Sequence, residues 1–157
     1  MNLPSLAGKL HRLLGRIGGS LQSLFLLIVR LYWGWQFFQT GKGKLGHLDR
    51  TAAFFASLHI PAPKVNAVMA GGTECVGGLL LLAGLGSRFA SLALIGVMSV
   101  AYATDDRKAL LGIFTDPDKF LSADPFLFLY ASAIVFIFGP GRVSLDALIG
   151  GKRDSAG

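Results

Sequence analysis

Two ionisable residues interrupt the longest apolar stretches of this sequence. Arg30 lies near the middle of an apolar segment at residues 21–39. Glu74 lies near the middle of a second apolar segment at residues 66–85. A charge at the centre of a lipid bilayer costs about 3 kcal/mol or more, so such a residue marks a functional site by default. Because the two charges have opposite signs at similar expected depth, we predict that they pair or face one polar cavity.

Two interpretations of this predicted pair stay open. In the first, Arg30 and Glu74 form a buried ion pair that fixes the register of two helices. In the second, the two charges bind a ligand, a proton or the head group of a quinone.

Further polar and aromatic residues follow Arg30. Gln36 lies six residues after Arg30, and Lys44 lies just beyond the end of the same segment. Aromatic side chains crowd this end of the segment: Tyr32, Trp33, Trp35, Phe37 and Phe38. Such a cluster is typical of an aromatic belt with a snorkelling lysine at a membrane interface. The alternative is a wall for a flat aromatic ligand, with Gln36 and Lys44 as candidate ligand residues.

The composition indicates that membrane-spanning helices position these residues. The 157-residue chain is 52% hydrophobic and only 15% charged, whereas a soluble domain has about 25% charged residues. A spanning helix needs about 20 mostly apolar residues, and lipid offers no partners for free backbone groups. The predicted fold class is therefore all-α, an integral membrane four-helix bundle. We expect its spans at residues 21–39, 66–85, 88–103 and 124–139.

The second and third spans are predicted to be close neighbours. Only residues 84–88 connect them, so these two helices must be antiparallel and adjacent. Small residues in the second span, Gly72, Gly77 and Gly78, favour a close approach of another helix.

Two further segments are predicted to lie at the membrane surface. Residues 5–17 place leucine and isoleucine near one helical face and Lys9, Arg12 and Arg16 elsewhere, which is typical of an amphipathic interfacial helix. In the first loop, Asp49 is expected to cap a short interfacial helix at residues 51–58 that dips into the interface or covers the bundle.

These elements predict three parts of the chain. An amphipathic segment at residues 1–20 precedes the four-span domain at residues 21–148, and a flexible polar tail follows at residues 149–157.

The charges favour a membrane partner over nucleic acid. The net charge is +6, but the basic residues flank apolar segments and form no dense stripe. Seven Lys or Arg residues fall on each side of the predicted membrane, so their number does not orient the chain. The basic N-terminal segment and the acidic loop at residues 105–124 favour cytoplasmic termini.

The sequence predicts neither a metal site nor a thiol pair. Cys75 is the single cysteine, and the three histidines lack ligand spacing with any cysteine or carboxylate. No catalytic residue is predicted.

Short motifs follow one another in an order that resembles a known family. They are Arg30-x-x-x-Gly34-x-x-x-Phe38-x-x-Gly41-x-x-Lys44, Glu74-x-x-Gly77-Gly78, Gly84-Leu85-x-x-Arg88 and Gly139-Pro140-Gly141-Arg142. Together they resemble the DoxX family of small four-span bacterial membrane proteins, over residues 30–148. The resemblance implies a multi-pass protein of the bacterial inner membrane. It also implies that the positions matching the family pattern, Arg30, Lys44, Glu74 and Arg88, are candidate site residues. Family members often carry a histidine after the third span, where this chain has Asp105, Asp106 and Arg107, so a histidine-dependent redox or metal role does not transfer.

The resemblance also implies a functional setting. Relatives include a subunit linked to thiosulfate:quinone oxidoreduction and proteins implicated in redox assemblies. We therefore expect an accessory or assembly subunit of a membrane redox system, without catalytic activity of its own, that meets a soluble redox partner or a membrane complex. The alternatives are a quinone-interacting oxidoreductase subunit, with quinone as its cofactor, and a small transporter.

Overall fold

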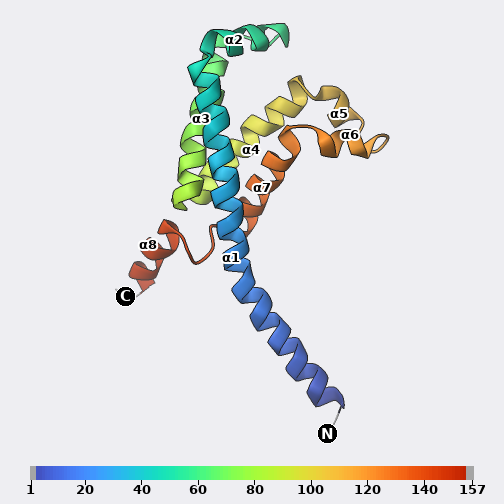
Figure 1. Ribbon diagram of the computed structural model, residues 1–157, viewed down its shortest axis with the longest axis vertical. Coiled ribbons are helices and arrows are strands. Elements are labelled where there is room, and N and C mark those ends of the chain that lie inside the picture. Colours follow the sequence, from blue (N-terminus) through green and yellow to red (C-terminus); the bar gives the residue numbers. More distant parts are fainter. Residues whose placement is uncertain (1–2, 155–157) are drawn as a thin grey trace.

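The computed structural model describes the backbone of residues 3–154, and the side chains of residue 8 and residues 10–150. Within this range the chain forms helices and no strand (Figure 1). The helices are α1 (Leu3–Gly46), α2 (Leu48–Ser57), α3 (Pro63–Ala83), α4 (Ser87–Thr104), α5 (Arg107–Leu111), α6 (Pro117–Ser122), α7 (Pro125–Phe138) and α8 (Leu145–Asp154). The predicted all-α class is confirmed.

Three of the described helices, α1, α3 and α4, are long and apolar enough to cross a membrane. The apolar helix α7 has 14 residues, fewer than the length that a perpendicular span needs. The structure thus supports three long spanning helices and one shorter fourth candidate, and the predicted four-span bundle stays a prediction.

The connection between α3 and α4 has the predicted tightness. Helix α3 ends at Ala83 and is capped by Gly84, whose φ of 68° lies in the left-handed region that glycine adopts without strain. Helix α4 begins at Ser87. The two helices are antiparallel and in contact, as expected from the short loop.

A seam of glycines joins α1 and α3. A Cβ atom added to Gly41 would lie 2.5 Å from the backbone N of Cys75, and one added to Gly78 would lie 2.6 Å from the carbonyl O of Gly34. The two backbones therefore touch, which only residues without a side chain permit. We call Gly34, Gly41, Gly71 and Gly78 the glycine seam.

Of the three glycines predicted to allow close helix packing, two lie against another helix and one does not. Gly78 belongs to the glycine seam, and a Cβ on Gly77 would lie 2.9 Å from Leu94 of α4. A Cβ on Gly72 would meet no atom within 4 Å, so Gly72 supports no helix contact within the described chain.

The core lies where α1 and α3 meet α4 and α7. Phe37 and Leu94 are fully buried there. Phe128 of α7 makes edge contacts with both Trp33 and Phe37 of α1, with ring centroids 5.0 and 4.8 Å apart. Burial of these aromatic side chains holds α7 against α1.

Helix α1 is longer than the sequence indicates. The amphipathic segment expected at residues 5–17 and the first span expected at 21–39 form one unbroken helix, because no proline interrupts them. Its N-terminal half extends away from the other helices (Figure 1), and its described side chains up to Gln22 are exposed. The side chain of Lys9 lies outside the described residues. A position of this segment on the membrane surface stays a prediction.

The first loop contains the expected short helix, but its predicted cap is wrong. Helix α2 begins after His47, not after Asp49. The Thr51 hydroxyl donates to the carbonyls of Lys44 and His47, at 3.2 and 3.1 Å, which joins the start of α2 to the end of α1. Asp49 therefore falls in the first turn, where its carboxylate accepts a hydrogen bond from Lys64 at 3.1 Å.

The segment predicted as a flexible tail is helical where it is described. Residues 149–154 continue α8, and residues 155–157 lie outside the described part. Its flexibility, like the division into three parts, stays a prediction.

Candidate functional site

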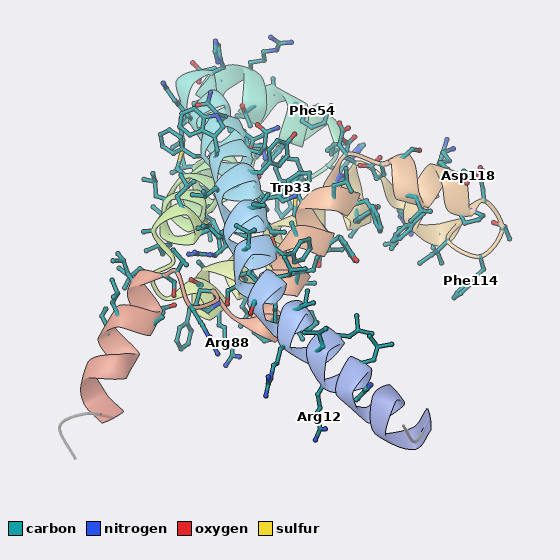
Figure 2. All side chains as sticks on the ribbon, turned by 60° about the horizontal axis from the view of Figure 1, so that its bottom comes forward. Arg12, Trp33, Phe54, Arg88, Phe114 and Asp118 are labelled. Atoms are coloured by element: carbon teal, nitrogen blue, oxygen red, sulfur yellow. The ribbon has the colours of Figure 1, made fainter. Side chains whose placement is uncertain are left out.

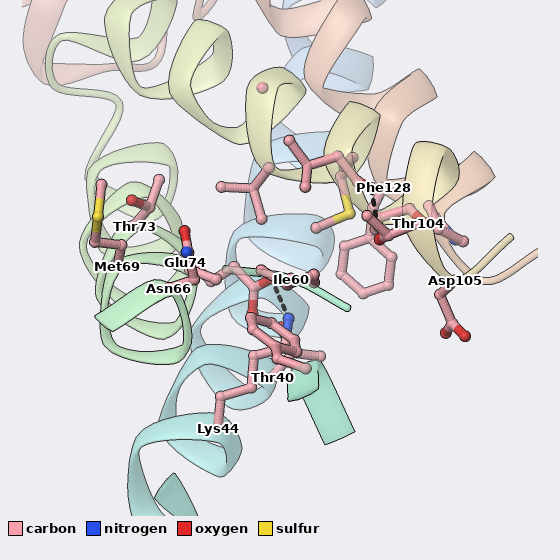
Figure 3. A pocket seen from close by; sticks show the side chains of 18 of the residues that line it. Thr40, Lys44, Ile60, Asn66, Met69, Thr73, Glu74, Thr104, Asp105 and Phe128 are labelled. Atoms are coloured by element: carbon pink, nitrogen blue, oxygen red, sulfur yellow. Dashed lines mark hydrogen bonds and ion pairs between the residues drawn. The ribbon is translucent and has the colours of Figure 1, made fainter. Parts of the chain in front are cut away.

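A cavity of about 660 Å³ lies between the α1–α3 pair and α4 with α7. Small-molecule sites have volumes of about 300–1,000 Å³. Its walls come from five helices, with Thr40 and Lys44 on α1, Phe54 and Phe55 on α2, Met69, Thr73 and Glu74 on α3, Val97 and Met98 on α4, and Phe128 on α7. Figure 3 shows labelled members of this lining, among them Lys44, Glu74 and Phe128, on helices that are distant in sequence. The cavity is thus large enough for a ring-sized ligand.

An ion pair between Lys44 and Glu74 forms the polar part of this wall. The Lys44 ammonium Nζ donates to Oε1 of Glu74 (Figure 3). The Glu74 side chain is 0% exposed and the Lys44 side chain 31% exposed. Oε2 of Glu74 has no hydrogen-bond partner within the described chain. A buried carboxylate oxygen without a partner is costly, so Glu74 retains an unused acceptor beside the cavity.

The glycine seam positions this pair. A Cβ on Gly41 would lie 2.9 Å from the Cβ of Glu74, so α3 approaches α1 closely at this point. Lys44 is three residues after Gly41 and lies on the same helical face. The lysine side chain therefore reaches the carboxylate across the seam.

Helix α2 covers one side of the cavity. Phe54, Phe55 and Leu58 of α2 and its following turn line the cavity, together with Ile60. Of the two expectations for this helix, the cover over the bundle agrees with these contacts. Apolar and aromatic walls around a few polar groups are typical of sites for lipophilic ligands.

Three aspartates complete the lining: Asp105 and Asp106 after α4, and Asp124 before α7. Burial raises the pKa of the Asp106 carboxyl above its usual value, and the negative charges of Asp105 and Asp124 raise it further. This rim is therefore the acidic end of the cavity, and the Asp106 carboxyl takes up a proton at a higher pH than a free aspartate does.

Arg30 lies elsewhere, and its predicted pairing with Glu74 is wrong. Its guanidinium donates from Nη1 to the carbonyl of Leu81, at 3.4 Å, and from Nη2 to the carbonyl of Val143. The 14 residues from Arg30 to Lys44 correspond to about 21 Å of helix. Because α1 and α3 are antiparallel, Arg30 meets the C-terminal end of α3 and Lys44 meets Glu74.

The C-terminal segment closes the Arg30 end. The Asp146 carboxylate accepts hydrogen bonds from the backbone N–H groups of Gly86 and Ser87, at 2.7 and 3.0 Å, and so caps the start of α4. The backbone N–H of Asp146 donates to the carbonyl of Gly84 at 2.9 Å. Arg30 is 1% exposed and lines none of the described cavities. We call Arg30, Val143 and Asp146 with the α3–α4 turn the C-terminal clasp.

Two other candidates stand apart from both regions. Gln36 is half-buried and Arg88 is exposed, and neither lines the Lys44–Glu74 cavity. A Cβ on Gly139 would lie 3.5 Å from Nη2 of Arg88, so this guanidinium lies over the end of α7.

A signal for the correct pairing was present in the sequence. Gly34 and Gly41 are seven residues apart, as are Gly71 and Gly78. Aligning these spacings in antiparallel helices places Gly41 opposite Gly71 and Gly34 opposite Gly78, and moves Arg30 away from Glu74. The roles of Phe128 and Asp146 had no comparable signal.

Among the side chains that the structure describes, no group of three histidine, cysteine or carboxylate residues could hold a metal ion.

Comparisons with known proteins agree with one family. The model of the family described as DoxX matches residues 25–105, which include both partners of the Lys44–Glu74 pair. An uncharacterized protein of Haemophilus influenzae is 30% identical over 129 residues, which cover 79% of this chain and 82% of that protein. No solved structure matches the chain.

Proposed function

This chain belongs to the DoxX family of membrane proteins, and from that premise we propose that it is a ligand-binding accessory subunit of a bacterial inner-membrane redox system. Its proposed ligand is a lipophilic molecule with a polar ring, namely a quinone. The site is the Lys44–Glu74 cavity. The termini face the cytoplasm in this proposal.

The observation that carries the proposal is the unpartnered Oε2 of Glu74 beside an apolar cavity. A quinone offers carbonyl acceptors, and its reduced form offers hydroxyl donors. The Lys44 ammonium is a donor for the former, and Oε2 of Glu74 is an acceptor for the latter. The same pair therefore suits both forms of one ring.

The walls of the cavity suit the rest of such a molecule. Phe54 and Phe128 provide aromatic surfaces for a flat ring, and Met69 and Met98 provide adaptable apolar surface. Lysine and glutamate carry no electrons. In this proposal the electrons therefore come from a redox partner protein, and this chain binds and orients the ring.

The test is direct binding of a short-chain benzoquinone to the purified protein in detergent, measured by titration calorimetry. Lys44→Met is expected to weaken binding about tenfold or more, because a hydrogen bond from a charged donor contributes about 1.5–3 kcal/mol. Glu74→Gln is expected to weaken binding of the corresponding hydroquinone more than that of the quinone.

A second ion pair provides the matched control. Lys64 and Asp49 pair at 3.1 Å at the surface, with side chains 67% and 92% exposed. Lys64→Met and Asp49→Asn are expected to leave the affinity unchanged. Equal affinities in the Lys44 and Lys64 variants would contradict the proposed function.

A further inference from the structure

A second hollow lies at the other end of α1 from Lys44, where α1 passes the turn after α7. Its volume is about 740 Å³. Figure 2 shows Arg12 and Arg88 at this end of the molecule, away from Phe54 of the first cavity. The residues that line it are Gly15, Arg16, Gly19, Ser20, Gln22, Ser23 and Leu26 of α1 with Phe138, Gly141, Arg142 and Ala147. We call it the terminal hollow.

The charges in the terminal hollow are all positive. Arg16 projects from α1 and Arg142 from the turn after α7, and both are exposed. Aspartate and glutamate do not occur among its described lining residues. Ser20 and Ser23 add hydroxyl groups to the lining. Arginine in this setting favours phosphate, which it binds through two parallel hydrogen bonds.

Glycines give the terminal hollow its shape. Cβ atoms on Gly15 and Gly19, which lie one helical turn apart, would meet no atom within 4 Å. At the inner end, Gly141 lies against α1, and a Cβ there would be 3.3 Å from Leu26. The space is therefore open at the arginine end and closed at the apolar end.

The terminal hollow lies where the apolar part of α1 begins. Leu26 at its inner end is buried, and the apolar run of residues 24–29 continues from there into the span. Phe138, which also lines the hollow, is 58% exposed. Positive charge on the outer side and exposed apolar surface on the inner side correspond to the phosphate level and the acyl-chain level of one leaflet.

We propose that the terminal hollow binds one anionic phospholipid, with its phosphate between Arg16 and Arg142 and its acyl chains along Phe138. This site is independent of the ligand in the Lys44–Glu74 cavity. A bound lipid would fasten the extended half of α1 to the end of α7, where the described protein contacts leave it exposed.

The test uses the full-length protein in detergent, titrated separately with phosphatidylglycerol, phosphatidylcholine and inorganic phosphate, with bound lipid counted by native mass spectrometry. We expect phosphatidylglycerol to bind more tightly than phosphatidylcholine. The variant Arg16→Gln/Arg142→Gln should bind phosphatidylglycerol about twenty-five-fold more weakly, since each basic residue near an anionic surface contributes about a fivefold factor.

Two further variants separate a built site from general positive charge. Arg50→Gln/Lys108→Gln removes the same charge from exposed residues elsewhere and should retain the preference. Gly19→Leu keeps both arginines but fills the hollow, and should weaken phosphatidylglycerol binding while leaving thermal stability unchanged. This variant also tests the site if the double arginine variant does not fold.

Three results would overturn the proposal. One is equal affinity for the two lipids, and another is an equal loss in the Arg50/Lys108 control. The third is displacement of phosphatidylglycerol by inorganic phosphate at comparable concentration, which would identify a site for free anions.

Discussion

The same two helices, α1 and α3, bury a charged residue at each end of their contact, and the two ends differ in what surrounds the charge. At the C-terminal clasp, Arg30 meets backbone carbonyls of Leu81 and Val143, and a Cβ on Gly84 would overlap its guanidinium. At the other end, Glu74 meets one side chain and an open cavity. The comparison shows that burial of a charged side chain does not by itself identify a ligand-binding site.

Each charge also keeps one polar atom without a described partner, Nε of Arg30 and Oε2 of Glu74. Only the glutamate lines a cavity that a ligand could enter. We therefore assign Arg30 a structural role, which is to hold the C-terminal segment against the α3–α4 turn. In the proposed function, Glu74 is the ligand residue of the two.

The largest expected effect follows from Arg30→Leu. This change removes both hydrogen bonds that the guanidinium donates, to the carbonyls of Leu81 and Val143. Because a hydrogen bond to a charged group contributes about 1.5–3 kcal/mol, we expect a loss of about 3–5 kcal/mol of unfolding free energy. Thermal or denaturant unfolding in detergent measures it. Arg88→Leu, an exposed arginine at the same end, should change stability by less than about 0.5 kcal/mol.

The same experiment distinguishes the clasp from the original pairing hypothesis. Adding Glu74→Gln to Arg30→Leu should not restore stability. Restoration would mean that the two residues interact after all and would remove the distinction between the two ends.

A smaller effect is expected at the Lys44–Glu74 end. Glu74→Gln and Lys44→Met should each lower stability, and a double-mutant cycle should give a coupling energy of about 1–3 kcal/mol. The loss from Glu74→Gln is smaller than the loss from Arg30→Leu, because the remaining Lys44 is partly exposed and can reach water. The double variant should recover stability without recovering quinone binding. Recovery of both would make the pair purely structural.

Asp146→Asn should cost about 1–2 kcal/mol, because a weaker acceptor then caps the two N–H groups at the start of α4. Hydrogen exchange should become faster at Gly86 and Ser87 and stay unchanged at Glu74. A change spread over both ends would show that the clasp and the cavity are not separate units.

The smallest effect concerns pH. The pKa of Asp106 is raised in the folded protein, so its contribution to stability is fully present below the ordinary aspartate pKa of about 4 and is lost as pH rises through the raised value. Thermal stability of the protein should fall slightly over that interval, and Asp106→Asn should remove the fall. Solvent screening keeps the effect small. An unchanged pH profile in the variant would exclude Asp106 as its source.

The parts of the fold predicted correctly are those that composition and chain length determine. Lipid leaves helices as the solution for long apolar segments, and a loop as short as residues 84–88 forces adjacent antiparallel helices. The partner of Arg30 is predicted wrongly because the pairing assumes that the midpoints of two apolar segments lie side by side. Helix α1 instead extends well beyond its contact with α3.

The tertiary partners were harder to predict. Lys44 was placed beyond the span, yet its long side chain reaches back to Glu74 across the seam. The contacts of Asp146 and Phe128 join segments far apart in sequence, and apolar periodicity carries no information on such pairs. Only the matched glycine spacings encoded the register between two helices.

The glycine seam also limits how a cavity of this kind can diversify. Because even a methyl group does not fit at Gly34, Gly41 or Gly78 without moving a backbone, the α1–α3 wall is a fixed template. Directed evolution toward a bulkier molecule should accumulate substitutions at Phe54, Val97 and Phe128 and leave these glycines intact. Lys44 and Glu74 would then keep their positions, while substitutions in the other walls change which ligand the cavity selects.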